Sequence, residues 1–158
     1  MINFLKIFTV INLFHISLFG HCQVPCGIYS DTMQIMQIRE DLKTIEKAME
    51  MIRTLSGKSD PQAFNQMSRW ISKKEEHAQN IQTLTSEYFL TQRIKTNTVN
   101  YAEKVVILHK LLVSAMKCKQ TVEINNVHNS LLLLDSFSNL YFDKHGLEHL
   151  KNLEKNSR

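Results

Sequence analysis

The stretch HCQVPC, residues 21–26, places a histidine and two cysteines within six positions near the start of the chain. If the chain is cut directly before His21, that residue gains a free α-amine beside its imidazole. The amine, the peptide nitrogen of Cys22 and the Cys22 thiolate can then bind one metal ion through two fused five-membered chelate rings. Pro25 and the glycine after Cys26 let the chain fold back, so the Cys26 thiolate can close a fourth position.

Two nitrogen and two sulfur donors in small chelate rings favour planar coordination, which is typical of Ni(II) or Cu(II) rather than zinc. The metal must also ionise the peptide nitrogen, which these late metals do best. The His21 imidazole can reach an axial position through a six-membered ring. Two thiolates and an anionic amide lower the potential of the M(III)/M(II) couple, so the stretch predicts redox chemistry. Copper binds more tightly than nickel, so metal supply would decide between them.

The cut that this chemistry needs falls at a change in composition. Residues 1–20 carry a single charge, Lys6, followed by an apolar run from Ile7 to Phe19 and a small glycine. This pattern is typical of a secretory signal peptide, so we expect the leader to be removed and the mature protein to be exported. An uncleaved membrane anchor is the alternative, although the run is short and polar for a bilayer span.

The charge pattern limits the classes of partner. The chain has 19 Lys and Arg against 15 Asp and Glu, a formal net charge of +4. Basic and acidic residues are interleaved, as in SKKEEH at residues 72–77, so we expect no nucleic-acid binding. Once the leader is removed we expect no membrane association either. A mild positive charge favours attraction of a small anion.

Helical periodicity dominates the chain after the metal-binding stretch. Apolar residues recur every three or four positions in four segments, and Gly and Pro are scarce, which predicts an all-α, antiparallel four-helix bundle. The first predicted helix begins at residue 31 or 32 and ends at Gly57, and the second opens at residues 60–61 and ends at about 94. The third begins near 101 and ends near 118–120, and the fourth begins near 124 and ends at 144–146. The expected organisation is a leader at 1–20, an irregular metal-binding hook at 21–30, a bundle at 31–144 and a tail at 145–158. In the tail we expect a frayed helical turn.

Local signals set the ends of the first two helices. Asp31 or Thr32 can cap the first helix at its start. Gly57 ends that helix, as glycine commonly does. Asp60 suits the N-cap of the second helix and Pro61 its first position.

The stretch HCQVPCGIY, residues 21–29, resembles the nickel hook of the nickel-containing superoxide dismutases, His-Cys-x-x-Pro-Cys-Gly-x-Tyr, at every invariant position. The resemblance continues through a first helix, a second helix opening at Asp-Pro, and Tyr88-Phe89 near the end of that helix. It implies one nickel ion per subunit and superoxide as the substrate, converted to O2 and H2O2 by Ni(III)/Ni(II) cycling. It also implies that four-helix protomers form a homohexamer.

The resemblance assigns a role to each matching residue of the hook. His21 would supply the amine and the axial imidazole, Cys22 the amide nitrogen and one thiolate, and Cys26 the second thiolate. Tyr29 would stand near the open face of the metal and order water or superoxide. Pro25 would follow a cis peptide bond that shapes the hook.

Three residues outside the hook are expected to support the site. The family holds the axial imidazole with a Glu on the first helix and an Arg on the second, and these positions fall on Gln37 and Lys73. Glu40 lies three residues after Gln37, and lysine keeps the charge of arginine without its planar fork. Tyr88 is expected to lie close to the hook.

Two other functions stay open from the sequence. Cys22 and Cys26 could form a disulfide in an exported helical module without catalytic activity. The same hook could instead serve a nickel or copper carrier that does not turn over. Cys118, on the third predicted helix, is expected to be a buried or idle thiol.

Overall fold

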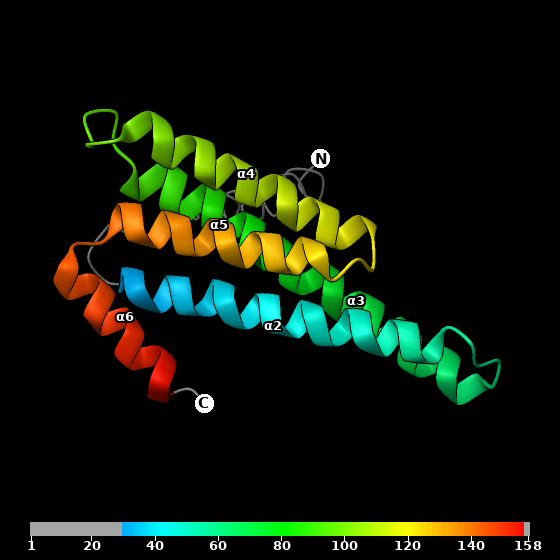
Figure 1. Ribbon diagram of the computed structural model, residues 1–158. Helices are drawn as coiled ribbons and strands as arrows, with labels where there is room; N and C mark the ends of the chain where they lie inside the picture. The colour runs from blue at the N-terminus through cyan, green and yellow to red at the C-terminus, as the bar shows by residue number, and fades with distance from the viewer. Residues whose placement is uncertain (1–29, 157–158) are drawn as a thin grey trace, which may run out of the picture.

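The computed structural model describes residues 30–156, which are arranged in helices joined by short connections (Figure 1). The leader, residues 1–20, and residues 21–29 of the hook lie outside the described residues. Within them the elements are α2 (Asp31–Leu55), α3 (Pro61–Thr83), the π-helix η2 (Leu84–Arg93), α4 (Tyr101–Gln120), α5 (Asn125–Tyr141) and α6 (Lys144–Asn156).

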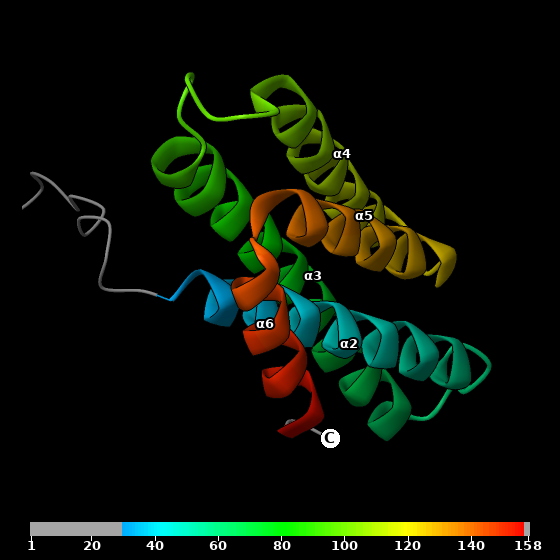
Figure 2. The same ribbon diagram turned by 60° about the vertical axis from the view of Figure 1, so that its left-hand side comes forward.

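Helices α2, α3, α4 and α5 form an antiparallel four-helix bundle, which confirms the predicted fold class. Consecutive helices pack side by side, and α5 returns against α2 to close the bundle. The α2–α3 hairpin extends past the α4–α5 pair at the end opposite to the start of α2 (Figures 1 and 2). Among residues 30–156, no helix combines the length and the apolar character that a membrane span needs.

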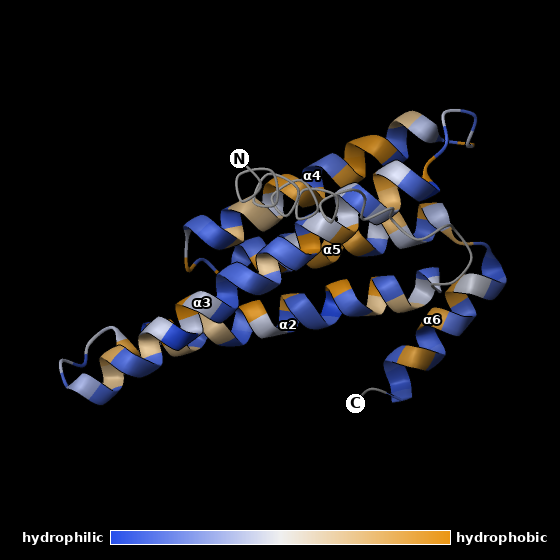
Figure 3. Cartoon of the chain, turned by 180° about the vertical axis from the view of Figure 1, so that it is seen from behind, coloured by the Kyte–Doolittle hydropathy of each residue, from blue (hydrophilic) through white to orange (hydrophobic). Residues whose placement is uncertain are grey.

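The core consists of the apolar stripes that the three- and four-residue spacing predicts, and polar residues alternate with them along each helix (Figure 3). Burying one such side chain contributes about 1.5–3 kcal/mol to stability. The fully buried apolar residues of α2 are Ile35, Ile38, Leu42, Ile45, Ala48 and Met49. They meet a second set from the other helices, which includes Ile81, Phe89, Leu108, Leu111, Leu134 and Phe137.

One predicted helix cap is confirmed and one is wrong. The carboxylate of Asp60 accepts a hydrogen bond of 2.9 Å from the backbone N–H of Ala63, so Asp60 caps α3 as expected. At the start of α2 the N-cap position belongs to Ser30, which makes no side-chain cap bond. Asp31 and Thr32 do not cap the helix because their side chains bond to residues of other elements.

The predicted second helix reaches its expected end, but its last ten residues form a π-helix rather than an α-helix. In this form backbone N–H groups bond five residues back, as Ile94 N does to Phe89 O at 2.9 Å. π-Helices are rare and account for less than about 1% of the residues in globular proteins. They occur frequently at functional sites. The apolar periodicity of the sequence does not distinguish this segment from an α-helix.

The prediction of a frayed turn at the C-terminus is wrong, because Lys144–Asn156 form a complete helix, α6. This helix turns back from α5 and crosses the N-terminal part of α2 (Figure 2). Leu150 is buried there and Leu153 packs against the core. The guanidinium Nε of Arg39 on α2 lies 3.0 Å from Glu154 Oε1. The packing of α6 on α2 therefore uses Leu150 and Leu153, which lie three residues apart on one face of the helix.

Candidate metal centre

The predicted metal ligands, His21, Cys22 and Cys26, lie outside the described residues, as do Pro25 and Tyr29. Their role, and the cis peptide bond expected before Pro25, stay predictions. The chemistry of the donor set fits nickel, because nitrogen and thiolate donors suit late transition metals. Within residues 30–156, no group of three or more His, Cys, Asp or Glu side chains is placed to hold a metal ion.

Asp31, the first residue of α2, lies at the junction of the hook with the bundle and binds residues from two other elements. Its Oδ2 accepts a hydrogen bond of 2.7 Å from the Tyr141 hydroxyl at the end of α5. Its Oδ1 accepts a hydrogen bond from the Tyr88 hydroxyl and lies 2.8 Å from Arg93 Nε, both residues of η2. These four residues form the Asp31 cluster.

Arg93 completes the cluster through Tyr88 as well as through Asp31. Its Nη2 donates a hydrogen bond of 2.7 Å to the Tyr88 hydroxyl, and its guanidinium carbon lies 4.8 Å from the centroid of the Tyr88 ring. The side chains of Asp31 and Arg93 are 25% and 16% exposed. The pair is therefore less screened by solvent than a surface salt bridge, which contributes only about 0–1 kcal/mol.

Both phenols of the cluster hold their protons more tightly than a free tyrosine. Burial raises the pKa of Tyr141 and of Tyr88, and the hydrogen bonds to Asp31 raise both pKa values further. The cause of the second effect is that a phenolate beside a carboxylate would place two negative charges together. Both hydroxyls therefore remain hydrogen-bond donors at neutral pH.

The aromatic rings of the cluster are held by a buried phenylalanine. Phe89 is fully buried, and its ring meets those of Tyr88 and Tyr141 edge-on, with centroids 5.1 and 5.8 Å away. Phe137 stacks on Tyr141 at 5.1 Å. Each such pair adds about 0.5–1.5 kcal/mol beyond the buried area. This packing limits the movement of the two hydroxyls that bind Asp31.

A second contact ties the first turn of α2 to α6. Thr32 Oγ1 lies 3.2 Å from Nδ1 of His149 and 2.7 Å from the hydroxyl of Ser30. Together with the Asp31 cluster, this contact joins the first turn of α2 to η2, α5 and α6. The residues that directly follow the hook motif are therefore held from three sides.

Gln37 and Lys73, the predicted supports of the axial imidazole, bond elsewhere within the described residues. Gln37 is exposed on α2 and its Nε2 donates to Asp41 Oδ1 at 3.3 Å. Lys73 is exposed on α3 and its Nζ bonds Glu76 Oε2 at 2.7 Å. A polar contact between α2 and α3 is made instead by Asp41 and His77, with 2.6 Å between His77 Nδ1 and Asp41 Oδ1. The supporting role of Gln37 and Lys73 stays a prediction.

The Asp41–His77 pair was missed in the sequence. Asp41 is 1% exposed, and its Oδ2 is buried without a hydrogen-bond partner among the described residues. A buried carboxylate at Nδ1 accepts a hydrogen bond from that nitrogen and so selects the histidine tautomer that carries its proton there. No pattern in the sequence marks the pair, because its two residues lie 36 positions apart on different helices.

Cys118 is fully buried and unpaired, which confirms its predicted role as a buried thiol. Burial raises the pKa of this thiol, with a smaller opposing effect from a hydrogen bond to Ser130. A protonated, buried thiol is a poor metal ligand and a poor nucleophile. Lys74, also buried, donates a hydrogen bond of 2.8 Å to the Cys118 carbonyl near the end of α4.

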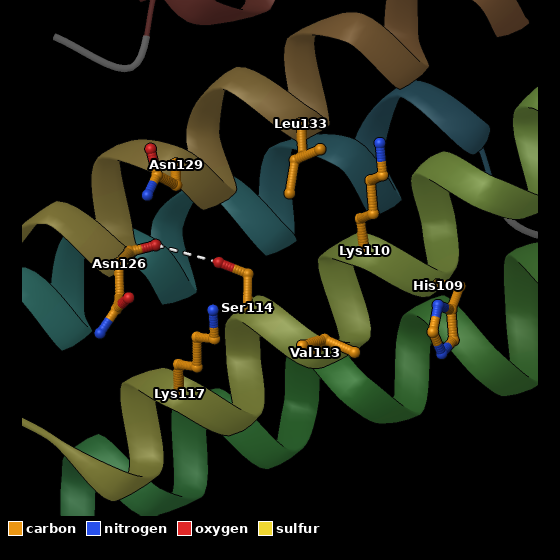
Figure 4. A pocket seen from close by; sticks show the side chains of 8 residues that line it. All are labelled: His109, Lys110, Val113, Ser114, Lys117, Asn126, Asn129 and Leu133. Carbon is orange, nitrogen blue, oxygen red and sulfur yellow. Dashed lines mark hydrogen bonds between the residues drawn. The ribbon is translucent and has the colours of Figure 1, made fainter.

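A pocket of about 380 Å³ lies between α4 and α5, away from the Asp31 cluster (Figure 4). Ser114 stands in its wall, where its hydroxyl donates to the Asn126 carbonyl at 3.1 Å. The lining has one histidine and no carboxylate or thiol, so it offers a single metal donor of the usual kinds. The lining residues are His109, Lys110, Val113, Ser114, Lys117, Asn126, Asn129 and Leu133.

Comparison with protein families gives one match. The family model for nickel-containing superoxide dismutase matches residues 17–145, a range that includes the whole hook and helices α2 to α5. No curated protein and no solved structure gives a significant match. Because the family model covers well over half of the chain, this protein belongs to the nickel-containing superoxide dismutase family, a family of oxidoreductases that use nickel to disproportionate superoxide.

Proposed function

We propose that this nickel superoxide dismutase binds its metal through the hook, residues 21–30, after residues 1–20 are removed. The observation that carries the proposal is that the family match begins at residue 17 and includes a stretch with every invariant residue of the hook motif. In this proposal His21 contributes its new α-amine and its imidazole, Cys22 its peptide nitrogen and thiolate, and Cys26 its thiolate.

The bound nickel supplies one-electron oxidation and reduction, so that two superoxide ions and two protons become one O2 and one H2O2. The chain itself contributes attraction and orientation. The charge falls from +4 to +3 when the leader and its Lys6 are removed, and a positive protein attracts the superoxide anion. Tyr29 and Tyr88 are proposed to order water or superoxide at the open face of the hook.

Tyr88 suits an ordering role better than a role as proton donor. Its hydroxyl proton is engaged by Asp31 Oδ1, and the raised pKa of Tyr88 keeps that proton in place. The hydroxyl oxygen accepts a hydrogen bond from Arg93, which orients its remaining lone pair. We therefore propose that Tyr88 positions other groups and that water delivers the two protons.

Gln37 and Lys73 are proposed to support the His21 imidazole, as the family pattern suggests. The Asp41–His77 pair offers a second polar contact on the same two helices. The distance between its Nδ1 and Oδ1 is 2.6 Å, so it directly links α2 and α3.

Export and self-association complete the proposal. The leader pattern of residues 1–20 supports export to the periplasm or the medium. A homohexamer is proposed from the family resemblance. It is compatible with the large apolar side chains that α3 and α4 leave exposed, which are Phe64, Ile71, Tyr101, Val106 and Met116. A further subunit packed on these helices would cover them.

Protein purified from its native host tests the proposal in one preparation. The mass of the mature chain should place His21 at the N-terminus, metal analysis should give one nickel per subunit, and superoxide should decay faster in its presence. A mature chain that starts elsewhere removes the amine ligand and contradicts the proposal. Nickel binding without faster decay would favour a carrier, and a Cys22–Cys26 disulfide without metal would favour a non-catalytic module.

A further inference from the structure

The Asp31 cluster differs from the other ion pairs of the described residues in its make-up. Three of the others join residues three positions apart on one exposed helix face, as Lys73 and Glu76 do. Others join different helices, as Arg39 does with Asp135 and Glu154. In the Asp31 cluster one carboxylate pairs with an arginine and also accepts hydrogen bonds from two tyrosine hydroxyls, of η2 and of α5. A partly buried polar network of this kind calls for an explanation other than stability, because apolar packing usually stabilises a protein equally well.

The π-helix is what allows Arg93 to join this network. In an α-helix, residues five positions apart point about 140° away from each other. The wider turn of η2 brings Tyr88 and Arg93 to one face, so that Arg93 Nη2 reaches the Tyr88 hydroxyl at 2.7 Å and Nε lies 2.8 Å from Asp31. A rare backbone form thus serves to place one arginine beside Asp31.

Covalent geometry puts the cluster at the base of the hook. Asp31 is the second residue after Tyr29, and two peptide units span at most about 7 Å. The contacts that hold the Asp31 side chain also restrict the backbone of Asp31. They therefore restrict the position and orientation of the backbone that continues into the hook. Metal sites need their ligands held to within about 0.5 Å, so the rigidity of this point affects the site directly.

We propose that Asp31 is a positioning residue for the nickel hook: through Tyr88, Arg93 and Tyr141 it holds the first turn of α2 and the Tyr88 hydroxyl in one arrangement. This inference rests on the proposed function, since it takes residues 21–30 as the metal site. Asp31 does not touch the metal in this scheme. It acts through the backbone that it anchors and through the hydroxyl that it orients.

The variant Asp31→Asn tests the inference, because it keeps the shape of the side chain and removes the charge that Arg93 and both phenols bind. We expect its nickel affinity, measured by competition with a chelator, to fall about 10- to 100-fold, the usual effect of losing a group that orients metal ligands. The nickel–thiolate absorption bands should shift, and kcat should fall more than KM rises. The helical circular dichroism should stay unchanged.

Asp135→Asn is the matched control. Asp135 on α5 forms an ion pair of 2.6 Å with Arg39 on α2, so the variant removes the same charge and also breaks an Arg–Asp contact to α2. Arg39 lies eight residues after Asp31, about 12 Å further along the helix. We expect wild-type nickel affinity, absorption and kcat from this control, with at most a small loss of stability.

Tyr141→Phe provides a second variant if Asp31→Asn does not fold. It deletes one hydrogen bond to Asp31 and keeps the ring that stacks on Phe137, and we expect the same spectral shift at reduced size. If nickel binds to the wild type but the Asp31 and Tyr141 variants match Asp135→Asn in affinity, absorption and kcat, the positioning role is refuted. If the wild type starting at His21 binds no nickel, the proposed function itself fails, and the inference with it.

Discussion

The hydroxyl of Tyr141 donates a hydrogen bond of 2.7 Å to Asp31 across 110 residues of sequence, and so joins the end of the bundle to the residue that directly follows the hook. The orientation of the first turn of α2 consequently depends on α5 being in place. Binding of nickel by the hook is therefore expected to require the folded bundle, although none of the proposed ligands comes from it.

The two hook thiolates should be essential for activity and dispensable for folding. Replacing Cys22 or Cys26 with Ser should abolish nickel binding and superoxide decay, because a hydroxyl does not replace a thiolate donor to nickel. Circular dichroism should remain helical, since the buried core lies in the helices. Loss of helicity in these variants would show that the hook is structural.

Cys118→Ser is the control for these thiol variants. The residue is fully buried, so placing a hydroxyl there should lower the free energy of unfolding by about 1–3 kcal/mol. Nickel content per folded subunit should equal that of the wild type. A loss of nickel from this variant would mean that Cys118 belongs to the metal site.

An extra residue in front of His21 should abolish activity while every side-chain ligand stays intact. The added peptide bond converts the α-amine into an amide and removes one of the four planar donors. Superoxide decay and the nickel absorption bands measure the effect on a chain whose mass shows one added residue. Wild-type turnover by this chain would exclude the amine as a ligand.

The raised pKa values of Tyr88 and Tyr141 predict a loss of stability at alkaline pH. Each phenol binds its proton more tightly in the folded chain than in the unfolded chain, whose tyrosines titrate at about 10. Their contribution to the free energy of unfolding is complete below that pH. It is lost as the pH rises toward the folded-state pKa, by up to about 1.4 kcal/mol per pH unit for each group.

Chemical unfolding of the nickel-loaded protein between about pH 9 and 11 measures how steeply the free energy of unfolding falls with pH. Lysines also titrate in this range, so comparing Tyr141→Phe with the wild type gives the contribution of one phenol. The free energy of unfolding of the variant should fall less steeply with pH than that of the wild type. Equal slopes would mean that the pKa of Tyr141 is not raised by folding.

Two leucines on α5 test the packing of the bundle. Leu134 is fully buried, so Leu134→Ala should lower the free energy of unfolding by about 2–5 kcal/mol. Leu132, two residues earlier on the same helix, is 65% exposed, and Leu132→Ala should change stability by no more than about 0.5 kcal/mol. Thermal or denaturant unfolding followed by circular dichroism compares them, and equal losses would contradict the register of α5.

The amino-acid sequence by itself determined the helices of the bundle and the donor set of the hook. The spacing of Ile35, Ile38 and Leu42 places them on one face of α2, and Asp60 caps α3, because both signals act over a few residues of one helix. The donors His21, Cys22 and Cys26 could be found for the same reason, since they lie within one short stretch.

The tertiary structure decided which polar groups meet and where the last segments pack. Asp31 or Thr32 was expected to cap the first helix. Asp31 instead binds Tyr88 and Tyr141, because bonds from an arginine and two phenols outweigh one local cap bond. The Asp41–His77 pair likewise joins residues 36 positions apart. Such contacts leave no periodic trace in the sequence, since their partners come together only when separate helices pack.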